Sequence, residues 1–336
     1  MIATACLTPN SPTPAAPLVI AHRGASGSRP EHTLESYKLA IEEGADFIEP
    51  DLVMTRDHVL VARHENEISG TTDVATHPEF AARQATKIID GQSFTGWFTE
   101  DFTLVELKTL RARERLPELR PQNCAYDGQF EIPTFSEILA LAATTPERVG
   151  VYPEIKHGTY FDGLGMNMEA PLLAALEQAG FTKASDPVFI QSFEVGNLER
   201  LRKLTQLRLV QLIDGTGHPA DRPELPSTTM ITPVGLAAIA RYADAIGVTK
   251  ALIVPRDASG QSLSPTMLVD DAHKAGLKIH AWTFRAENAF LPAEWRAGTD
   301  PAAHGALAAE LRQFYELGID GVFCDFPGVA VRVRDP

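Results

Sequence analysis

Seven apolar segments of this chain end in side chains that carry charge, hydrogen-bond or stack. The ends are His22-Arg23, Glu49 with Asp51, His64, Glu154 with Lys156, Gln191 with Phe193, Trp282, and Asp325. Side chains two residues apart in a strand point to the same face, so each i, i+2 pair would enter one site. A single pair could be a structural ion pair, but polar residues at seven segment ends favour a functional site.

Three of these side chains, Glu49, Asp51 and Glu154, are carboxylates. Carboxylates that share a buried site repel one another unless a cation lies between them. A ligand set made only of carboxylate oxygens suits a hard ion such as Mg²⁺ or Ca²⁺ better than Zn²⁺. The sequence therefore predicts one divalent cation held by these three residues.

Basic side chains at the same segment ends predict an anionic ligand. When Arg23, Lys156 and a divalent cation are set against the three carboxylates, one positive charge is left in excess, which matches one phosphodiester. Arg23 can hold two phosphate oxygens as a fork, and Lys156 supplies a point charge. The site is thus suited to a phosphate ester.

Two histidines, His22 and His64, complete the predicted chemistry. Displacement at phosphorus needs one group to activate the nucleophile and another to protonate the leaving oxygen, and imidazole titrates in the range that suits both roles. We assign the nucleophile to His22, because Arg23 beside it would hold the phosphate. His64 is assigned to the leaving alcohol.

The elements that must position these residues alternate between short apolar strands and helices. Strands are predicted at 18–23, 47–54, 60–64, 149–156, 188–193, 208–214, 277–284 and 318–327, and the clearest helices at 33–44, 171–180 and 266–276. Eight strands with helical crossovers predict an α/β fold of the (β/α)8 TIM-barrel type, in which active-site residues project from the carboxyl ends of the strands. A ninth apolar run, 245–248, is interpreted as a short extra strand.

The predicted organisation is one catalytic domain over residues 18–332, preceded by a flexible segment, 1–17. A small insertion subdomain is expected at 65–131, after the third predicted strand, because connections of this length are usually structured or functional. We expect it to cap the barrel mouth. The basic run at 111–120 inside it is interpreted as a solvated helix end.

Composition excludes several other classes. The net charge is −14 and the isoelectric point is near 5.2, which argues against nucleic acid and anionic membrane surfaces as partners. No apolar run reaches the ~18 residues of a membrane span. Three scattered cysteines, Cys6, Cys124 and Cys324, predict no disulfide framework. The N-terminus shows no intact signal peptide, although "ATAC" at 3–6 is similar to the end of a lipoprotein signal.

The motifs also resemble those of the glycerophosphodiester phosphodiesterase family. "HRGASGSRPEHT", "EPDLVMTRD", "RH", "YPEIK", "QSF", "WTFR" and "DFP" occur in that family's order and span residues 18–328. The "PEHT" motif and the long insertion are most similar to the bacterial periplasmic-type branch. Two positions depart from the common pattern: Glu65 follows the second histidine where Asp is frequent, and His32 stands where many members have Asn.

The resemblance implies a (β/α)8 barrel that hydrolyses glycerophosphodiesters, such as glycerophosphocholine, to sn-glycerol 3-phosphate and an alcohol. It implies a histidine acid/base pair, a metal site with Ca²⁺ favoured and Mg²⁺ open, and a periplasmic or secreted location, with a lipid anchor through Cys6 as one possibility. By motif, the residues would be His22 and His64 for acid/base catalysis, Arg23, Lys156, Gln191, Phe193 and Trp282 for phosphate and substrate, and Glu49, Asp51 and Glu154 for the metal. Phe193 and Trp282 would wall the glycerol side.

Rival interpretations lie in other classes. A carboxylate-lined barrel can be a glycosidase, but two histidines with Arg23 and Lys156 fit phosphate better. A phospholipase D-like enzyme acting on lysolipid headgroups would want exposed apolar loops, and the insertion is polar apart from residues such as Trp97. A non-catalytic surface protein would have a degenerate site. The alcohol group, the nucleophile (water or the glycerol 2-hydroxyl) and the oligomeric state stay open.

Overall fold

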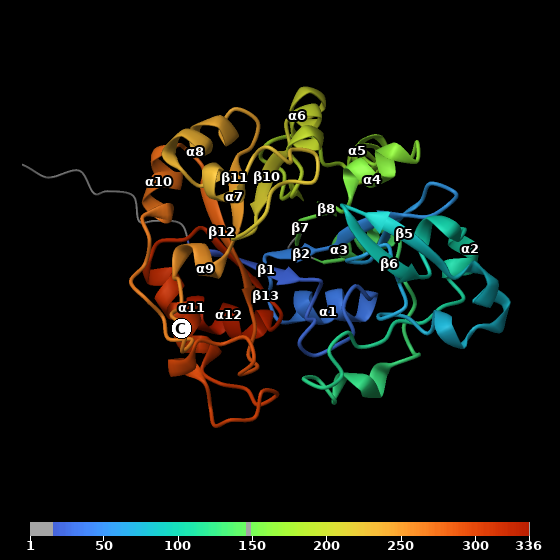
Figure 1. The fold of residues 1–336 in the computed structure, drawn as a ribbon, viewed down its shortest axis with the longest axis horizontal. Coiled ribbons are helices and arrows are strands. Elements are labelled where there is room, and N and C mark those ends of the chain that lie inside the picture. The colour runs from blue at the N-terminus through green and yellow to red at the C-terminus, as the bar shows by residue number, and fades with distance from the viewer. Residues whose placement is uncertain (1–15, 146–148, 336) are drawn as a thin grey trace, which may run out of the picture.

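A computed structural model describes residues 16–145 and 149–335, and its sheet closes into a barrel of parallel strands (Figure 1). Within these residues eight strands form the barrel, two of them in two pieces. They are β1 (Leu18–His22), β2 (Phe47–Glu49) continued by β3 (Asp51–Met54), β7 (Gly150–Val151) continued by β8 (Glu154–Ile155), β9 (Phe189–Ser192), β10 (Arg208–Ile213), β11 (Ala245–Thr249), β12 (Lys278–Phe284) and β13 (Gly321–Cys324). Parallel pairings run around the ring, from β1 with β2 to β13 with β1. The predicted (β/α)8 fold class is confirmed.

Two strand assignments from the sequence were wrong. The run at 60–64 gives β4 (Leu60–Ala62), which pairs antiparallel with β3 and lies outside the parallel ring. The run at 245–248, interpreted as an extra strand, is the barrel strand β11. Its Gly247 weakened the strand signal, yet a Cβ there would lie 2.5 Å from the Leu212 side chain, so the glycine is needed for strand packing.

Proline interrupts the two barrel strands that are in two pieces. Pro50 separates β2 from β3, and Pro153 lies just before β8. Proline has no N–H to donate to the ladder, but both carbonyls are used: Pro50 accepts from the Glu154 N–H at 2.9 Å and Pro153 accepts from the Gln191 N–H at 2.9 Å. The breaks therefore bend the strands without leaving the mouth of the barrel unpaired.

Helices cover the outside of the barrel (Figure 1). The longer ones are α1 (Leu34–Glu42), α3 (Phe135–Ala142), α5 (Glu169–Gln178), α6 (Val195–Leu204), α8 (Pro233–Ile239), α10 (Leu268–Lys274), α11 (Leu307–Glu316) and α12 (Pro327–Arg334); the shorter ones are α2 (Leu104–Leu107), α4 (Gly158–Gly163), α7 (Ser227–Met230) and α9 (Lys250–Ile253). The predicted helix at 33–44 is α1. Thr33 caps it by accepting from the Ser36 N–H, and Gly44 ends it in the left-handed region at φ +86°.

The segment between β4 and α3 holds the predicted insertion. It contains an antiparallel hairpin, β5 (Ala85–Ile89) and β6 (Gln92–Gly96), the short helix α2 and several 3₁₀ turns. Its buried side chains, such as Ile68, Phe102 and Leu107, belong to the same hydrophobic cluster as the layer between the barrel and its helices. The insertion therefore packs on the barrel and shares its core.

A separate aromatic cluster fills the barrel interior. Phe47, Tyr152, Phe189 and Phe323 pack there, with Tyr152 and Phe189 stacked at 5.0 Å between ring centroids. The Tyr152 hydroxyl bonds the Nδ1 of buried His280 at 2.7 Å. This plug closes the barrel beneath the site. No helix of the described chain is long and apolar enough to cross a membrane. Cys6 and almost all of the predicted flexible segment lie outside the described residues.

Candidate active site

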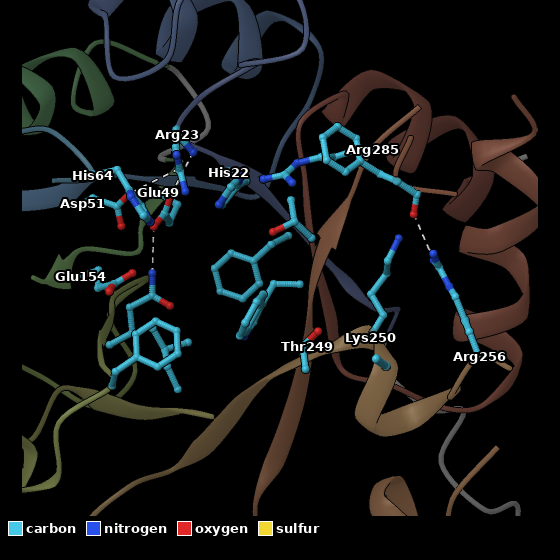
Figure 2. A pocket seen from close by; sticks show the side chains of 18 residues that line it. His22, Arg23, Glu49, Asp51, His64, Glu154, Thr249, Lys250, Arg256 and Arg285 are labelled. Carbon is cyan, nitrogen blue, oxygen red and sulfur yellow. Dashed lines mark hydrogen bonds and ion pairs between the residues drawn. The ribbon is translucent and has the colours of Figure 1, made fainter. Parts of the chain in front are cut away.

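The predicted site residues line one cavity of about 480 Å³ at the carboxyl ends of the strands (Figure 2). Those that line it are His22, Arg23, Glu49, Asp51, His64, Glu154, Gln191, Phe193 and Trp282. Lys156 lines an adjoining cavity and reaches the same centre, with its Nζ 3.0 Å from Glu154 and 3.2 Å from the His64 Nε2. The structure thus brings all ten predicted side chains together.

Glu49, Asp51 and Glu154 form a buried carboxylate cluster. One oxygen from each lies within 4.8 Å of the others. Burial, followed by repulsion from Asp51 and Glu154, raises the pKa of Glu49 well above its usual range, and burial raises the pKa of Glu154 to about 8. Carboxylates held together at such cost to ionisation, with only oxygen donors, fit a hard divalent cation.

A histidine behind this cluster fixes Asp51. The His32 Nε2 lies 2.9 Å from the Asp51 Oδ2, and its Nδ1 lies 2.7 Å from the Tyr37 hydroxyl. The buried Arg63 guanidinium donates to the His32 carbonyl at 2.8 Å, which holds the loop in place. His32, noted in the sequence as a departure from the common pattern, is therefore a packed partner of a carboxylate in the cluster.

Asp325 orients His22. Its carboxylate lies 2.7 Å from the His22 Nδ1 and also pairs with Arg285 at 2.9 Å and Arg120 at 2.5 Å. Although burial acts to raise it, the pKa of Asp325 is held well below its usual range by these two arginines and His22. An ionised Asp325 accepts from the Nδ1–H, which leaves the His22 Nε2 with a lone pair. Burial and then Arg23 lower the pKa of His22 to about 4, so the ring is neutral at pH 7.

Glu65 orients His64. Its carboxylate contacts the His64 Nδ1 and pairs with Arg115, which also holds Glu31. Glu in place of the more frequent Asp therefore keeps the histidine in place. On the other side of the ring, Lys156 donates to the Nε2 at 3.2 Å. Burial, then Arg23 and Lys156, lower the pKa of His64 to about 3, so this ring is also neutral.

Arg23 is pinned beside the carboxylates. Its side chain pairs with Glu31 at 2.8 Å and lies 3.4 Å from Asp51, and its N–H donates to Glu49 at 2.8 Å. The residue adopts φ +60°, an uncommon backbone conformation for a non-glycine residue. Arg23 lines the cavity, where it was predicted to meet phosphate.

Two aromatic rings form one wall. Phe193 and Trp282 meet edge to face with centroids 5.9 Å apart, and the Lys156 Nζ lies 5.7 Å from the Phe193 centroid. Gln191 donates to Glu49 at 2.9 Å, and its buried Oε1 has no hydrogen-bond partner among the described residues. The cavity therefore has a charged end, an aromatic wall and a free buried acceptor.

Sequence reasoning missed the basic residues that support the site. Arg120 is only 6% exposed in its side chain and links Asp325 to Glu287 at 2.5 Å each. Arg120 and Arg115 belong to the run at 111–120, so its interpretation as a solvated helix end was wrong. The run has the composition of a surface segment, and its carboxylate partners lie up to 205 residues away in the chain. Arg285, which is part of the "WTFR" motif, was not predicted as a site residue, yet it pairs with Asp325 at 2.9 Å.

The fold and the grouping of these side chains are typical of (β/α)8-barrel enzymes, whose catalytic groups come from the carboxyl ends of different strands. A family model described as the glycerophosphoryl diester phosphodiesterase family matches residues 22–329. A glycerophosphodiester phosphodiesterase of Arabidopsis thaliana is 37% identical over 93% of this chain and 84% of its own length. One of Haemophilus influenzae is 30% identical over 94% of this chain and 88% of its own length.

This chain belongs to the glycerophosphodiester phosphodiesterase family and is a phosphoric diester hydrolase. Solved structures agree on the fold. A glycerophosphoryl diester phosphodiesterase from Silicibacter pomeroyi matches with a TM-score of 0.69 at 21% identity, covering 96% of this chain and 94% of its own. A phosphodiesterase from Oleispira antarctica, solved in complex with the product sn-glycerol-3-phosphate, matches with a TM-score of 0.63 at 21% identity, covering 96% and 98%.

Proposed function

We propose that this enzyme hydrolyses glycerophosphodiesters such as glycerophosphocholine to sn-glycerol 3-phosphate and an alcohol, by metal-dependent histidine acid/base catalysis. The observation that carries the proposal is that a buried carboxylate cluster, two neutral histidines and Arg23 share one cavity in a member of this family. The Oleispira relative, which holds sn-glycerol-3-phosphate, supports the product.

His22 acts as the general base. A neutral imidazole with its Nδ1–H held by Asp325 presents the Nε2 lone pair to a nucleophile, and Arg23 next to it places the phosphate. Proton removal by a positioned base of this kind contributes about 10²–10⁴-fold in rate. The nucleophile is either water or the glycerol 2-hydroxyl, which would pass through a cyclic phosphate.

His64 delivers the proton to the leaving alcohol. Its ring is neutral in the structure, but the negative charge of a phosphodiester entering the cavity favours the protonated form. Glu65 on its Nδ1 stabilises that form as well. Lys156, which contacts both Glu154 and His64, stays charged and meets the phosphate with Arg23.

Glu49, Asp51 and Glu154 would hold the cation, with Ca²⁺ favoured and Mg²⁺ as the alternative. When bound, the ion would neutralise phosphate charge and polarise the phosphorus centre. The three carboxylates position this charge, while Gln191 fixes the orientation of Glu49. Phe193 and Trp282 would exclude water from the glycerol side.

We also propose that residues 18–332 are one catalytic domain, that 65–131 is an insertion in it, and that the enzyme belongs to the periplasmic-type branch and works in the periplasm or outside the cell. The family match over 22–329 supports the domain, and the "PEHT" motif supports the branch. Fusion of the natural N-terminus to a reporter that is active only outside the cytoplasm would test the location.

The decisive test of function is product analysis. Purified enzyme with glycerophosphocholine and Ca²⁺ should release sn-glycerol 3-phosphate and choline in equal amounts, measured by ³¹P NMR and an enzyme-coupled choline assay. Release of phosphocholine and glycerol instead would show cleavage on the other side of phosphorus and refute the proposal.

A second candidate substrate is a lysolipid headgroup ester. Ile88 and Phe94 of the insertion hairpin are exposed apolar side chains, and Asp90 at its tip pairs with His157 beside the barrel mouth at 2.6 Å. Such a tip could contact an acyl chain. Lysophosphatidylcholine tested against glycerophosphocholine separates the two, and a higher kcat/KM for the lysolipid would favour this candidate.

A further inference from the structure

The active-site cavity extends well beyond the carboxylates and histidines. Its opposite end is formed by the start of α9, the loop after it and the segment that follows β12, and includes Thr249, Lys250, Arg256, Arg285 and Phe290. Figure 2 shows Glu49, Asp51 and Glu154 on one side, and Lys250 with Arg256 on the other. We call the group Lys250, Arg256 and Arg285 the basic end.

The basic end holds more positive than negative charge. Lys250 and Arg256 share a single carboxylate, that of Glu310, at 2.8 Å and 3.2 Å. Arg285 adds no net charge to this count, because Arg285 and Arg120 together face two carboxylates, Asp325 and Glu287. Glu310 is only 1% exposed, so solvent contributes little to balancing the charges around its carboxylate.

This excess charge is costly where it lies. Lys250 is only 9% exposed, and burial lowers its pKa. A buried ammonium needs an opposite charge close by, and Glu310, whose two oxygens lie 2.8 Å and 2.9 Å from the Lys250 Nζ, also has to balance Arg256. The protein as a whole is acidic, at −14, so a local positive end in this cavity is a selective feature for an anion.

We propose that the basic end is an oxyanion subsite, which binds a second phosphate or a carboxylate carried by the part of the substrate that extends past Phe193 and Trp282. The inference rests on the proposed function, since it extends the same cavity. It predicts a substrate class: glycerophosphodiesters with a second negative group are preferred over those that end in a neutral or cationic group. Arg256 supplies a fork and Lys250 a point charge for that group.

Matched substrate pairs test the subsite on the unmodified enzyme. Bis(glycerophospho)glycerol differs from glycerophosphoglycerol by one phosphoglycerol unit, and glycerophosphoserine differs from glycerophosphoethanolamine by one carboxylate. We expect kcat/KM to be at least about tenfold higher for bis(glycerophospho)glycerol, the scale of one charge-assisted hydrogen bond. A preference in the phosphate pair alone assigns the subsite to phosphate. A preference in the serine pair as well assigns it to oxyanions in general. Equal values within both pairs overturn the proposal.

Two variants locate the effect. Lys250→Met removes the charge at similar length, and Arg256→Gln changes the more exposed partner, in case the buried lysine is needed for folding. In each variant the preference ratio should fall toward one. The control, Lys274→Met, alters an exposed lysine on α10 and should keep the wild-type ratio. A ratio that survives both folded variants overturns the assignment. If the wild-type enzyme hydrolysed none of these glycerophosphodiesters, the proposed function itself would be refuted.

Discussion

Glu49 is the residue whose charge depends most on what occupies this site. Its carboxylate lies beside two others, and its pKa is raised by burial and by their repulsion. Asp51 is held in its position by His32, whose Nε2 lies 2.9 Å from its Oδ2. The proposed cation would therefore balance charge in the site as well as supply its chemistry.

Removing the cation should abolish activity. Exhaustive chelation is expected to leave no measurable hydrolysis, and added Ca²⁺ or Mg²⁺ should restore it. Glu49→Gln keeps the shape and removes the charge, so titration calorimetry should show at least tenfold weaker cation binding, the scale of losing one charged ligand. Glu35→Gln, an exposed acid on α1, serves as the control. Activity that persists after chelation would contradict the metal assignment.

The two histidines should separate on substrates with different leaving groups. On glycerophosphocholine, His22→Ala and His64→Ala should each lower kcat about 10²–10⁴-fold. A nitrophenyl phosphodiester has a leaving group that needs no proton, so His64→Ala should lose much less activity there than His22→Ala. The exposed His273 provides a matched His→Ala control. Equal losses on both substrates would mean that the roles are assigned wrongly.

At the scale of elements, the insertion supplies part of the active-site support. It carries Arg120, which bridges Asp325 after β13 and Glu287 after β12, and Arg115, which bridges Glu31 and Glu65. Since Asp325 and Glu65 orient the two histidines, the insertion supports both proposed catalytic groups through these arginines. These contacts give the insertion a supporting role in addition to the expected one of a cap over the barrel mouth.

Arg120→Met should therefore destabilise the fold and slow the reaction. It leaves buried Glu287 without its ion-pair partner and removes one of the two arginines that hold Asp325. Breaking a buried ion pair in this way costs about 3–5 kcal/mol. The urea midpoint should fall clearly below that of Arg113→Met, which changes an exposed arginine of the same segment. In the folded variant kcat should drop more than KM rises, because His22 loses its orientation. A midpoint equal to the control's would show that the bridge carries no stability.

At the scale of the whole molecule, the barrel plug should make the fold sensitive to acid. His280 lies among aromatic rings with its Nδ1 bonded to Tyr152, and burial lowers its pKa to about 3. The unfolded chain binds this proton near pH 6.5 and the folded protein does not. The stabilising contribution is therefore complete above pH 6.5 and is lost as the pH falls from 6.5 toward 3.

His280→Asn should reduce this dependence. The asparagine Oδ1 can accept from Tyr152 as the Nδ1 does, but it does not titrate. Between pH 7 and pH 5 the wild type should lose about 2 kcal/mol more unfolding free energy than the variant, since each unit of pKa difference is worth about 1.4 kcal/mol. Denaturation midpoints at the two pH values measure the difference. Parallel losses in both proteins would show that His280 is not the group that titrates.

The sequence by itself determined the class of fold and the main chemical groups. Apolar runs ending in polar residues follow from strand and barrel geometry, so the spacing of Glu49, Asp51 and Glu154 was enough to place them together. Their charge made the cation a prediction. Thr33 and Gly44 marked the ends of α1 because caps act over only a few residues. These features depend on residues close together in the chain, so they can be predicted from the sequence.

The tertiary structure alone decided which strands pair and which distant charges meet. Periodicity does not give strand direction, so the reversal of β4 onto β3 and the place of β11 in the ring were missed. Arg120 and Lys250 resemble ordinary surface residues in the sequence. Their partners, Asp325 and Glu310, lie 205 and 60 residues away. The sequence gives the charge of each side chain. Whether that side chain is buried, and how many opposite charges it contacts, depends on which residues the folded chain packs around it.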